Sequence, residues 1–502
     1  MADDAGIVEP LADEAPIRSA PDPDGSLREL AGDCVHCGFC LPACPTYQLW
    51  GEEMDSPRGR IHLITQILET GQGSAAAAEH FDRCLGCMAC VTACPSGVHY
   101  DQLIEAARTW GEDGEPAAGG AGAPIPSPLP ARSLRDRAVR AAIFATFPYP
   151  SRLRAALAPL RVAQRTGLDQ LALRSKVLAR LAPEAAAALA VAPAPPAAAP
   201  PDAGQDAPGG READEHRGGD RRRSWKLSAR SPSARCPVLP ARIPARGERR
   251  AVVGMLTGCV QQVLFPQVNV ATARVLAAEG CDVIVPRAQG CCGALSLHGG
   301  RRAEAAAFAR RTIETFERAG VDAVVVNAAG CGSALKEYGH LLAGDPGWAA
   351  RAAALSARVR DFAEFLAELG PVAPRSSLPL TVAYHDACHL AHAQRITAQP
   401  RALLRGVPGL VLADIADGAT CCGSAGIYNL VQPEAAAELG RRKARAVQAT
   451  GADLLVSANP GCSLQIAQAL AAAGQPMPVA HIAEVLDASI QARTPRALLQ
   501  GR

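Results

Sequence analysis

Eight cysteines near the amino terminus have a spacing that suits the binding of metal clusters. The sequence "CVHCGFCLPACP" has the pattern C-x2-C-x2-C-x3-C followed by proline, and "CLGCMACVTACP" repeats this pattern further along the chain. The first motif contains Cys34, Cys37, Cys40 and Cys44, and the second contains Cys84, Cys87, Cys90 and Cys94. Short spacers of this kind allow one loop to bind three corners of a cubane [4Fe–4S] cluster. A pair of zinc sites is disfavoured, because zinc commonly uses two C-x2-C pairs that lie far apart.

The two motifs together indicate a two-cluster ferredoxin module. In such modules the fourth cysteine of each motif binds the cluster held by the other motif. We therefore expect Cys34, Cys37, Cys40 and Cys94 to hold one [4Fe–4S] cluster. Cys84, Cys87, Cys90 and Cys44 are expected to hold the second.

The segment between the motifs is predicted to contain a helix. Ser56 can cap this helix, and Pro57 suits its first position. Apolar residues then follow at helical spacing from Ile61 to Leu68. Arg58 and Arg60 could tune a cluster or contact a partner, but solvated positions at the start of the helix are favoured.

The carboxy-terminal half carries a second cysteine pattern, which is duplicated. Two adjacent cysteines followed by glycine occur in "QGCCGAL" and again in "ATCCGSAG". The first copy has Cys259, Cys291, Cys292 and Cys331, and the second has Cys388, Cys421, Cys422 and Cys462 in nearly constant register. A duplicated domain is the simplest explanation for this self-similarity.

Each of these cysteines follows a short β-rich run, and helical stretches lie between the runs. Strands that alternate with helices predict parallel α/β units. Ligand sites of open α/β sheets form beyond the carboxyl ends of the strands, so the four cysteines of each copy should converge. Gly293 and Gly423 can let the backbone turn so that both adjacent thiols face the same point.

Three interpretations of the duplicated cysteines compete. They could be buried structural thiols, zinc ligands, or ligands of one or two additional iron–sulfur clusters or redox-active thiol centres. The constant register and the doubled pairs favour the last of these. Cys281 has no counterpart in the second copy and is predicted to be a core residue. His385, Asp386 and His389 flank Cys388 and could orient ligands, move protons to a quinone or bind metal, although a histidine satisfied by backbone hydrogen bonds is an equal alternative.

Composition limits the remaining possibilities. The chain has 502 residues, a formal net charge of +2 and 18 cysteines. The balanced charge does not favour nucleic acid, and no targeting segment or membrane-spanning run is evident. We expect a cytoplasmic protein with at most peripheral contact to the inner face of the membrane, in which cysteines serve metal or redox chemistry rather than disulfides.

The predicted fold class is α+β with several domains. A helical two-cluster ferredoxin domain is expected at 25–110, a helical connector at 111–181, and a disordered linker rich in Pro, Ala, Gly and Arg at 182–250. Two copies of a parallel α/β cysteine-rich domain should follow at 251–370 and 371–490.

The motifs quoted above resemble those of the cysteine-rich-domain family, which includes subunits of heterodisulfide reductase, anaerobic glycerol-3-phosphate dehydrogenase and lactate-utilisation proteins. The module order, together with "SPRGRI" and "YHDACHL", is most similar to the iron–sulfur subunits of bacterial glycolate oxidases. The resemblance covers roughly residues 25–185 and 250–490. One departure is that Ala328 and Asn459 stand three residues before Cys331 and Cys462, where units of the heterodisulfide reductase type carry a fifth cysteine.

This resemblance implies an oxidoreductase subunit that transfers electrons. Partner subunits with FAD would oxidise glycolate to glyoxylate, or a related 2-hydroxy acid such as D-lactate, and electrons would pass through this chain to a quinone or another membrane acceptor. No G-x-G-x-x-G motif follows a strand, so neither FAD nor NAD is expected on this chain. The alternatives are a thiol/disulfide redox subunit, an electron-transfer subunit of a lactate or glycerol-3-phosphate dehydrogenase, and a non-redox protein with structural metals.

The ligand prediction can be tested by replacing one cysteine. Cys40→Ser should remove one cubane, so iron and sulfide in the anaerobically purified chain should each fall by about four per chain. Cys236→Ser, in the predicted linker, should change neither value. Full cluster content in the Cys40→Ser variant would contradict the assignment.

Overall fold

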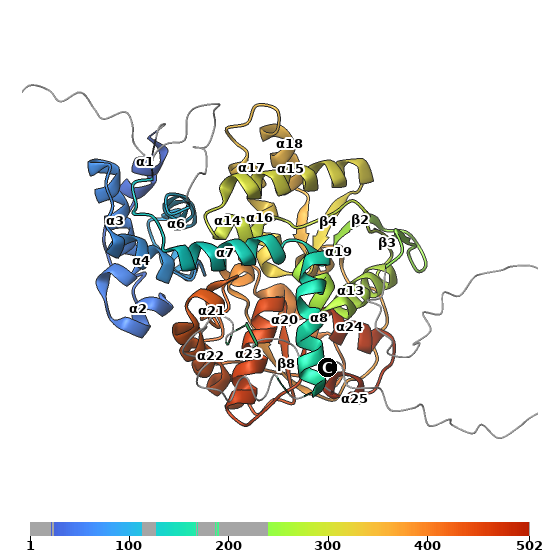
Figure 1. Ribbon diagram of the computed structural model, residues 1–502. Helices are drawn as coiled ribbons and strands as arrows, with labels where there is room; N and C mark the ends of the chain where they lie inside the picture. The colour runs from blue at the N-terminus through green and yellow to red at the C-terminus, as the bar shows by residue number, and fades with distance from the viewer. Residues whose placement is uncertain are drawn as a thin grey trace, which may run out of the picture.

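The computed structural model describes residues 25–112, 127–166 and 239–500, and the single positions 22, 168, 186, 188 and 189. It contains a helical amino-terminal module, two connecting helices and an α/β half with two sheets (Figure 1). This confirms the predicted fold class. Most of the predicted linker, 182–250, and Cys236 lie outside the described residues. The end of that range is described and forms strand β1, Arg242–Ile243, so regular structure begins before the boundary expected at 251.

The amino-terminal module is built from short helices around one small core. Its elements are α1 (Ser26–Gly32), α2 (Pro45–Trp50), the 3-10 turn η1 (Glu53–Asp55), α3 (Pro57–Thr70), α4 (Ala75–Arg83), α5 (Ala89–Ala93) and α6 (Tyr100–Thr109). Helix α3 begins as predicted, because the Ser56 hydroxyl accepts a hydrogen bond of 3.0 Å from the Gly59 N–H and Pro57 takes the first position. Ile64 and Leu68 from α3 pack with Leu103 and Ile104 from α6.

Two helices connect this module to the α/β half. They are α7 (Leu134–Thr146) and α8 (Pro150–Thr166), and α7 crosses from the amino-terminal module to the α/β half (Figure 1). Arg132 and Arg140, before and within α7, both form ion pairs with Asp82 of α4. These contacts fix the connector to the module, since Asp82 and both guanidinium groups are largely shielded from water.

The first cysteine-rich copy is an open sheet with strand order β1-β3-β2-β4-β5. Its further strands are β2 (Ala251–Leu256), β3 (Cys281–Ile284), β4 (Ala323–Val326) and β5 (Val359–Asp361). Strands β2 to β5 are parallel, with Val253 opposite both Val283 and Ala323, whereas β1 is an antiparallel edge strand. The helices of this copy are α12 (Val260–Leu264), α13 (Pro266–Ala278), α14 (Ala294–His298), α15 (Arg302–Ala319), α16 (Ala329–Lys336), α17 (Tyr338–Leu341), α18 (Ala349–Ser356) and α19 (Phe362–Leu369).

The second copy repeats this topology in a fully parallel sheet of order β7-β6-β8-β9. The strands are β6 (Thr381–His385), β7 (Val411–Ala413), β8 (Leu454–Ser457) and β9 (Val479–Ala480). The other elements are the π-helical turn η2 (His389–Ala393) and helices α20 (Ala398–Arg405), α21 (Tyr428–Val431), α22 (Pro433–Gln448), α23 (Pro460–Ala472), α24 (Ile482–Ile490) and α25 (Arg496–Leu499). In both copies the chain adds one strand beside the first and then crosses to its other side, which creates a ligand-binding crevice at the carboxyl ends.

The two copies share one hydrophobic core. Val253 and Met255 of β2 belong to the same buried cluster as Tyr384 of β6 and Val456 of β8. Cys281 lies in this cluster at the start of β3 with no exposed surface, which confirms that it is a core residue. The two copies, expected as successive domains, therefore cannot lose contact without exposing this core to water.

Among the residues that the structure describes, no helix combines the length and apolar character needed to cross a bilayer.

Arg60 organises the amino-terminal module from inside, which corrects the expectation that it is solvated. Its side chain is fully buried and forms hydrogen bonds of 2.6 Å to each of the His80 and Asp55 carbonyl oxygens, and of 3.2 Å to the Asp55 carboxylate. The reason is that the start of α3 presses directly on η1: a Cβ on Gly59 would lie only 2.0 Å from the Glu53 carbonyl oxygen. Arg58 is partly exposed and pairs with Glu53.

The buried network predicts a large loss of stability when Arg60 is replaced. Arg60→Met should destabilise the module by about 3–5 kcal/mol, because the Asp55 carboxylate and two carbonyls would lose a buried partner. Arg318→Met is the control, since Arg318 forms an exposed pair with Glu314 on one helix that is worth under about 1 kcal/mol. The apparent melting temperature, followed by circular dichroism and by cluster absorbance, should fall only for Arg60→Met. Equal melting of the two variants would refute this role.

Candidate metal centres

The eight ferredoxin-type cysteines line two small cavities. One cavity, of about 30 Å³, is lined by Cys34, Cys37, Cys40 and Cys94. The other, of about 20 Å³, is lined by Cys44, Cys84 and Cys87. Cys90 lies between the two and touches both. The first cavity thus meets three cysteines of the first motif together with Cys90 and Cys94 of the second, and the second cavity meets three cysteines of the second motif and Cys44 of the first.

The electrostatic environment of these thiols favours a bound cation. Burial raises the pKa of the Cys87 and Cys90 thiols well above the ordinary value, and neighbouring thiols raise it further. Burial would also raise the pKa of Cys84, but the Arg60 and Arg108 guanidinium groups outweigh it and lower that pKa. Crowded buried thiols of this kind repel one another when ionised, whereas a metal removes this cost by keeping them deprotonated. The donor set therefore fits iron–sulfur clusters.

The two cavities differ in their exposure. Around the first cavity, Cys37 is exposed, and the neighbouring Val35 and Phe39 are 68% and 65% exposed. Arg58 holds this loop by donating a hydrogen bond of 3.2 Å to the His36 carbonyl oxygen. In the second motif, Cys84, Cys87 and Cys90 are all buried.

The second motif is buried because it lies against the second cysteine-rich copy. Leu85 and Cys87 share a hydrophobic cluster with Cys388 and Cys421. The His389 ring nitrogen Nε2 lies 2.9 Å from the Gly86 carbonyl oxygen, and the Thr92 hydroxyl lies 2.7 Å from Nδ1 of His392. The second ferredoxin-type site and the second copy therefore adjoin through direct contacts.

The duplicated cysteines converge as the strand pattern predicts. Every one of these cysteines follows the carboxyl end of a strand, with Cys259 after β2, the first pair after β3 and Cys331 after β4. Gly293 and Gly423, with φ of +84° and +89°, turn the backbone after each pair. A Cβ at Gly423 would lie 2.7 Å from the Ala436 carbonyl oxygen, so this position requires glycine.

The sulfur atoms of each copy lie in a chain of contacts, in the order Cys259, Cys291, Cys292 and Cys331 in the first copy and Cys388, Cys421, Cys422 and Cys462 in the second. The Cys259 and Cys291 sulfurs are 3.5 Å apart. Hydrogen bonds from the two neighbouring thiols lower the pKa of Cys292 well below its ordinary value, and Cys422 behaves in the same way. Neighbouring thiols and burial raise the pKa of Cys291 and Cys331 in the first copy and of Cys421 and Cys462 in the second, so each copy presents one thiol that ionises readily beside two that resist ionisation.

The residues that flank Cys388 have separate surroundings. Asp386 forms a bidentate ion pair with Arg401, with both oxygens at 2.6 Å, which is a structural role. His385 is buried at the end of β6, beside Cys422 and Cys462. Asn459, in place of a fifth cysteine, donates its amide to the Cys462 sulfur at 3.4 Å.

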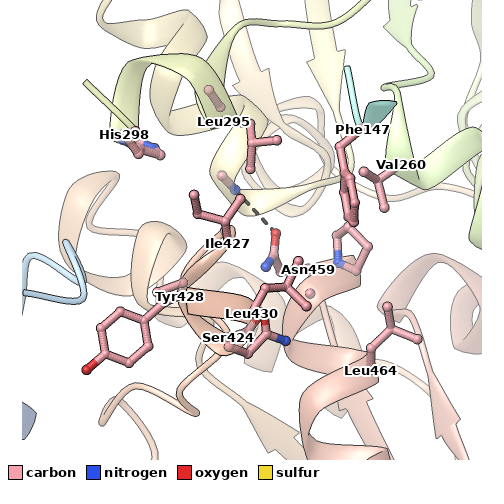
Figure 2. A pocket seen from close by; sticks show the side chains of 18 of the residues that line it. Phe147, Val260, Leu295, His298, Ser424, Ile427, Tyr428, Leu430, Asn459 and Leu464 are labelled. Carbon is pink, nitrogen blue, oxygen red and sulfur yellow. Dashed lines mark hydrogen bonds between the residues drawn. The ribbon is translucent and has the colours of Figure 1, made fainter. Parts of the chain in front are cut away.

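A cavity of about 540 Å³ is lined by cysteines from both copies. Its other walls are mainly apolar and include Phe147 and Leu464. Figure 2 shows Phe147, Leu295 and Ile427, which come from three separate parts of the chain, around the same space. We call this space the apolar cavity.

One polar pair at the apolar cavity was not predicted from the sequence. His298, which lines the cavity, has its Nδ1 atom 3.0 Å from the Glu105 carboxylate of α6. Burial, together with the nearby Asp101, raises the pKa of Glu105 to about 8, and burial with Arg108 lowers the pKa of His298 to about 4. At neutral pH Glu105 therefore carries a proton that it can donate to a neutral His298. Residues about 190 positions apart carry no local signal of this pairing.

Comparison with known proteins gives three family matches. A 4Fe-4S dicluster domain matches residues 31–98, and the linker region of glycolate oxidase iron-sulfur subunits matches 135–191. The cysteine-rich domain matches twice, at 253–336 and 382–467.

Full-length relatives extend these matches. The probable glycolate oxidase iron-sulfur subunit of Bacillus subtilis is 36% identical over 86% of this chain and 88% of its own length. The glycolate oxidase iron-sulfur subunit of Escherichia coli is 34% identical over 87% and 89%. Lactate utilization protein A of an Exiguobacterium species is 32% identical over 48% of this chain and 98% of its own. The combination of domains and the extent of the identity show that the chain belongs to the family of glycolate oxidase iron–sulfur subunits.

Proposed function

We propose that this chain is the electron-transfer subunit of an oxidoreductase that converts glycolate to glyoxylate. FAD-bearing partner subunits oxidise the 2-hydroxy acid, and this chain carries the electrons to a quinone. The observation that carries the proposal is the direct contact between the second ferredoxin-type site and the second cysteine-rich copy. This contact joins the metal sites of the two halves of the molecule.

The two small cavities support the ligand sets predicted for the ferredoxin-type cysteines. We assign Cys34, Cys37, Cys40 and Cys94 to one [4Fe–4S] cluster and Cys84, Cys87, Cys90 and Cys44 to the other. The support is that Cys94 reaches the cavity of the first motif and Cys44 reaches the cavity of the second, as the exchange of fourth cysteines requires. When bound, such clusters supply one-electron redox chemistry. The residues around them set their access: Val35 and Phe39 leave the first site near the surface, which suits contact with a flavin-bearing partner.

The apolar cavity suits the quinone. Quinone rings are flat and apolar with two carbonyl oxygens, and their reduction to hydroquinone takes two electrons and two protons. The cavity offers apolar walls between two groups of cysteines. Glu105 and His298 supply a proton at its edge, because the protonated Glu105 donates to Nδ1 and leaves the ring proton on Nε2. A quinone substrate places the complex at the inner face of the membrane, with this chain in peripheral contact.

D-lactate is a second candidate for the 2-hydroxy acid substrate. Two lactate utilization proteins are 32% and 34% identical to this chain over 48% and 47% of its length. The substrate is bound by partner subunits, so D-lactate would use the same electron route through this chain.

The function is tested with the purified complex of this chain and its flavin-bearing subunits. Glycolate should reduce a soluble quinone analogue rapidly in the complete complex and slowly when this chain is omitted. A complex that contains the Cys40→Ser variant should resemble the complex without this chain, while Cys236→Ser should have no effect. Equal quinone reduction with and without this chain would rule the function out.

The quinone site is tested by filling the apolar cavity. Leu464→Trp places a larger side chain against its wall and should lower kcat/KM for the quinone analogue about tenfold or more, since overpacking costs about 1–3 kcal/mol and 1.4 kcal/mol is tenfold. Leu464→Met, which nearly conserves volume, should stay close to the original value. Reduction of ferricyanide should be unchanged in both variants. A parallel loss with ferricyanide would place the defect upstream and exclude the cavity as the quinone site.

A further inference from the structure

His385 is a buried histidine that makes no hydrogen bond to the backbone or to an oxygen or nitrogen side-chain atom in the described part of the chain. It is the last residue of β6 and is 1% exposed. Neither ring nitrogen bonds to a nitrogen or oxygen atom of the described residues, and the polar neighbour of the ring is the Cys422 thiol. Burial of a polar ring without backbone hydrogen bonds is unfavourable, so a ligand that binds the ring would stabilise this position.

A structural histidine in this chain looks different. His481 is also buried at the end of a strand, but its Nδ1 atom accepts a hydrogen bond of 3.0 Å from the Ala483 N–H and caps α24. His385 also lies at the end of a strand, but no backbone N–H donates a hydrogen bond to its ring. Backbone hydrogen bonds therefore do not hold the His385 ring, in contrast to the alternative considered from the sequence.

Two thiols lie beside the His385 ring. One donor atom of His385 and the sulfurs of Cys422 and Cys462 all lie within 4.8 Å of one another, and all three residues are buried. Imidazole nitrogen and thiolate sulfur are the donors that zinc and iron–sulfur clusters take in mixed sites. Asn459 donates to the Cys462 sulfur from outside this trio, which orients that ligand.

The first copy lacks this arrangement. Three residues before Cys388 stands His385, whereas three residues before Cys259 stands Leu256, which packs in the core with Cys292. Within the described ranges, no three potential donor atoms of the first copy lie as close together as those of His385, Cys422 and Cys462. The duplication has thus produced two sites with different donor sets.

We propose that the second copy binds a metal centre through the imidazole of His385 together with the thiolates of Cys422 and Cys462, and that the first copy has no such nitrogen ligand. The proposal deepens the proposed function by giving the two cysteine-rich copies different chemistry. Replacing a thiolate by a neutral imidazole removes negative charge from a centre, which in iron–sulfur proteins raises the reduction potential. In that case the second copy would be the stronger electron acceptor of the two.

The test uses the full chain purified anaerobically from cells fed 15N-labelled histidine. Iron as the metal predicts a histidine nitrogen coupling in the electron–nuclear double resonance spectrum of the reduced protein. Zinc as the metal predicts one zinc per chain with a nitrogen ligand at about 2.0–2.1 Å in X-ray absorption. In either case His385→Leu, which copies Leu256, should remove the nitrogen signal and the metal of that centre.

Two further variants separate ligand loss from misfolding. His385→Cys restores a donor, so it should retain metal but lose the nitrogen signal. His62→Leu, at an exposed position on α3, should match the original chain. Absence of any histidine nitrogen bound to iron or zinc in the unaltered chain would overturn the proposal. Unchanged metal content and spectra in His385→Leu would also overturn it, and neither result would affect the electron-transfer role tested with the complex.

Discussion

The crowding of thiols at the carboxyl ends of parallel strands is the constraint on which this molecule depends. A parallel sheet directs the ends of its strands to one edge, so cysteines distant in sequence meet there without a contiguous motif. Thiols this close cannot all ionise unless a cation compensates them, and they have little access to water. The glycines after each pair, the shared core beneath the sheets and the helices that cover them all serve to keep sulfur atoms in these positions.

The ferredoxin-type module meets the same constraint differently. Its loops supply most ligands locally, but the module contains a buried cation, Arg60, whose hydrogen bonds connect η1 to the end of α4 and whose charge favours the thiolate of Cys84. The same guanidinium thus stabilises both the fold and a ligand. Gly86 and Thr92 of the second motif contact His389 and His392, which follow Cys388. The second ferredoxin-type site and the site of the second copy therefore hold each other in position.

Features whose sequence signal is local could be predicted. The C-x2-C-x2-C-x3-C spacing, the cap at Ser56 and the strand that precedes each duplicated cysteine can all be recognised within a dozen residues. Arg60 could not be placed, because its burial depends on the backbone contact between Gly59 and Glu53 and not on helical periodicity. The pairing of Glu105 with His298 and the core common to β2 and β6 join distant segments, and nothing in the local pattern encodes them.

Duplication explains why two similar sites can acquire different functions. Both copies keep the sulfur chain, since the strand ends and the glycine turns impose it, but the residue three positions before the first cysteine is free to differ. Leu256 extends the hydrophobic core, whereas His385 gives up that packing and places a polar ring beside the Cys422 and Cys462 sulfurs. The His385 ring lies in the copy that contacts the second ferredoxin-type motif. A centre with a more positive potential at that point would draw electrons from the ferredoxin module toward the apolar cavity, so the asymmetry between the copies would itself set the direction of transfer.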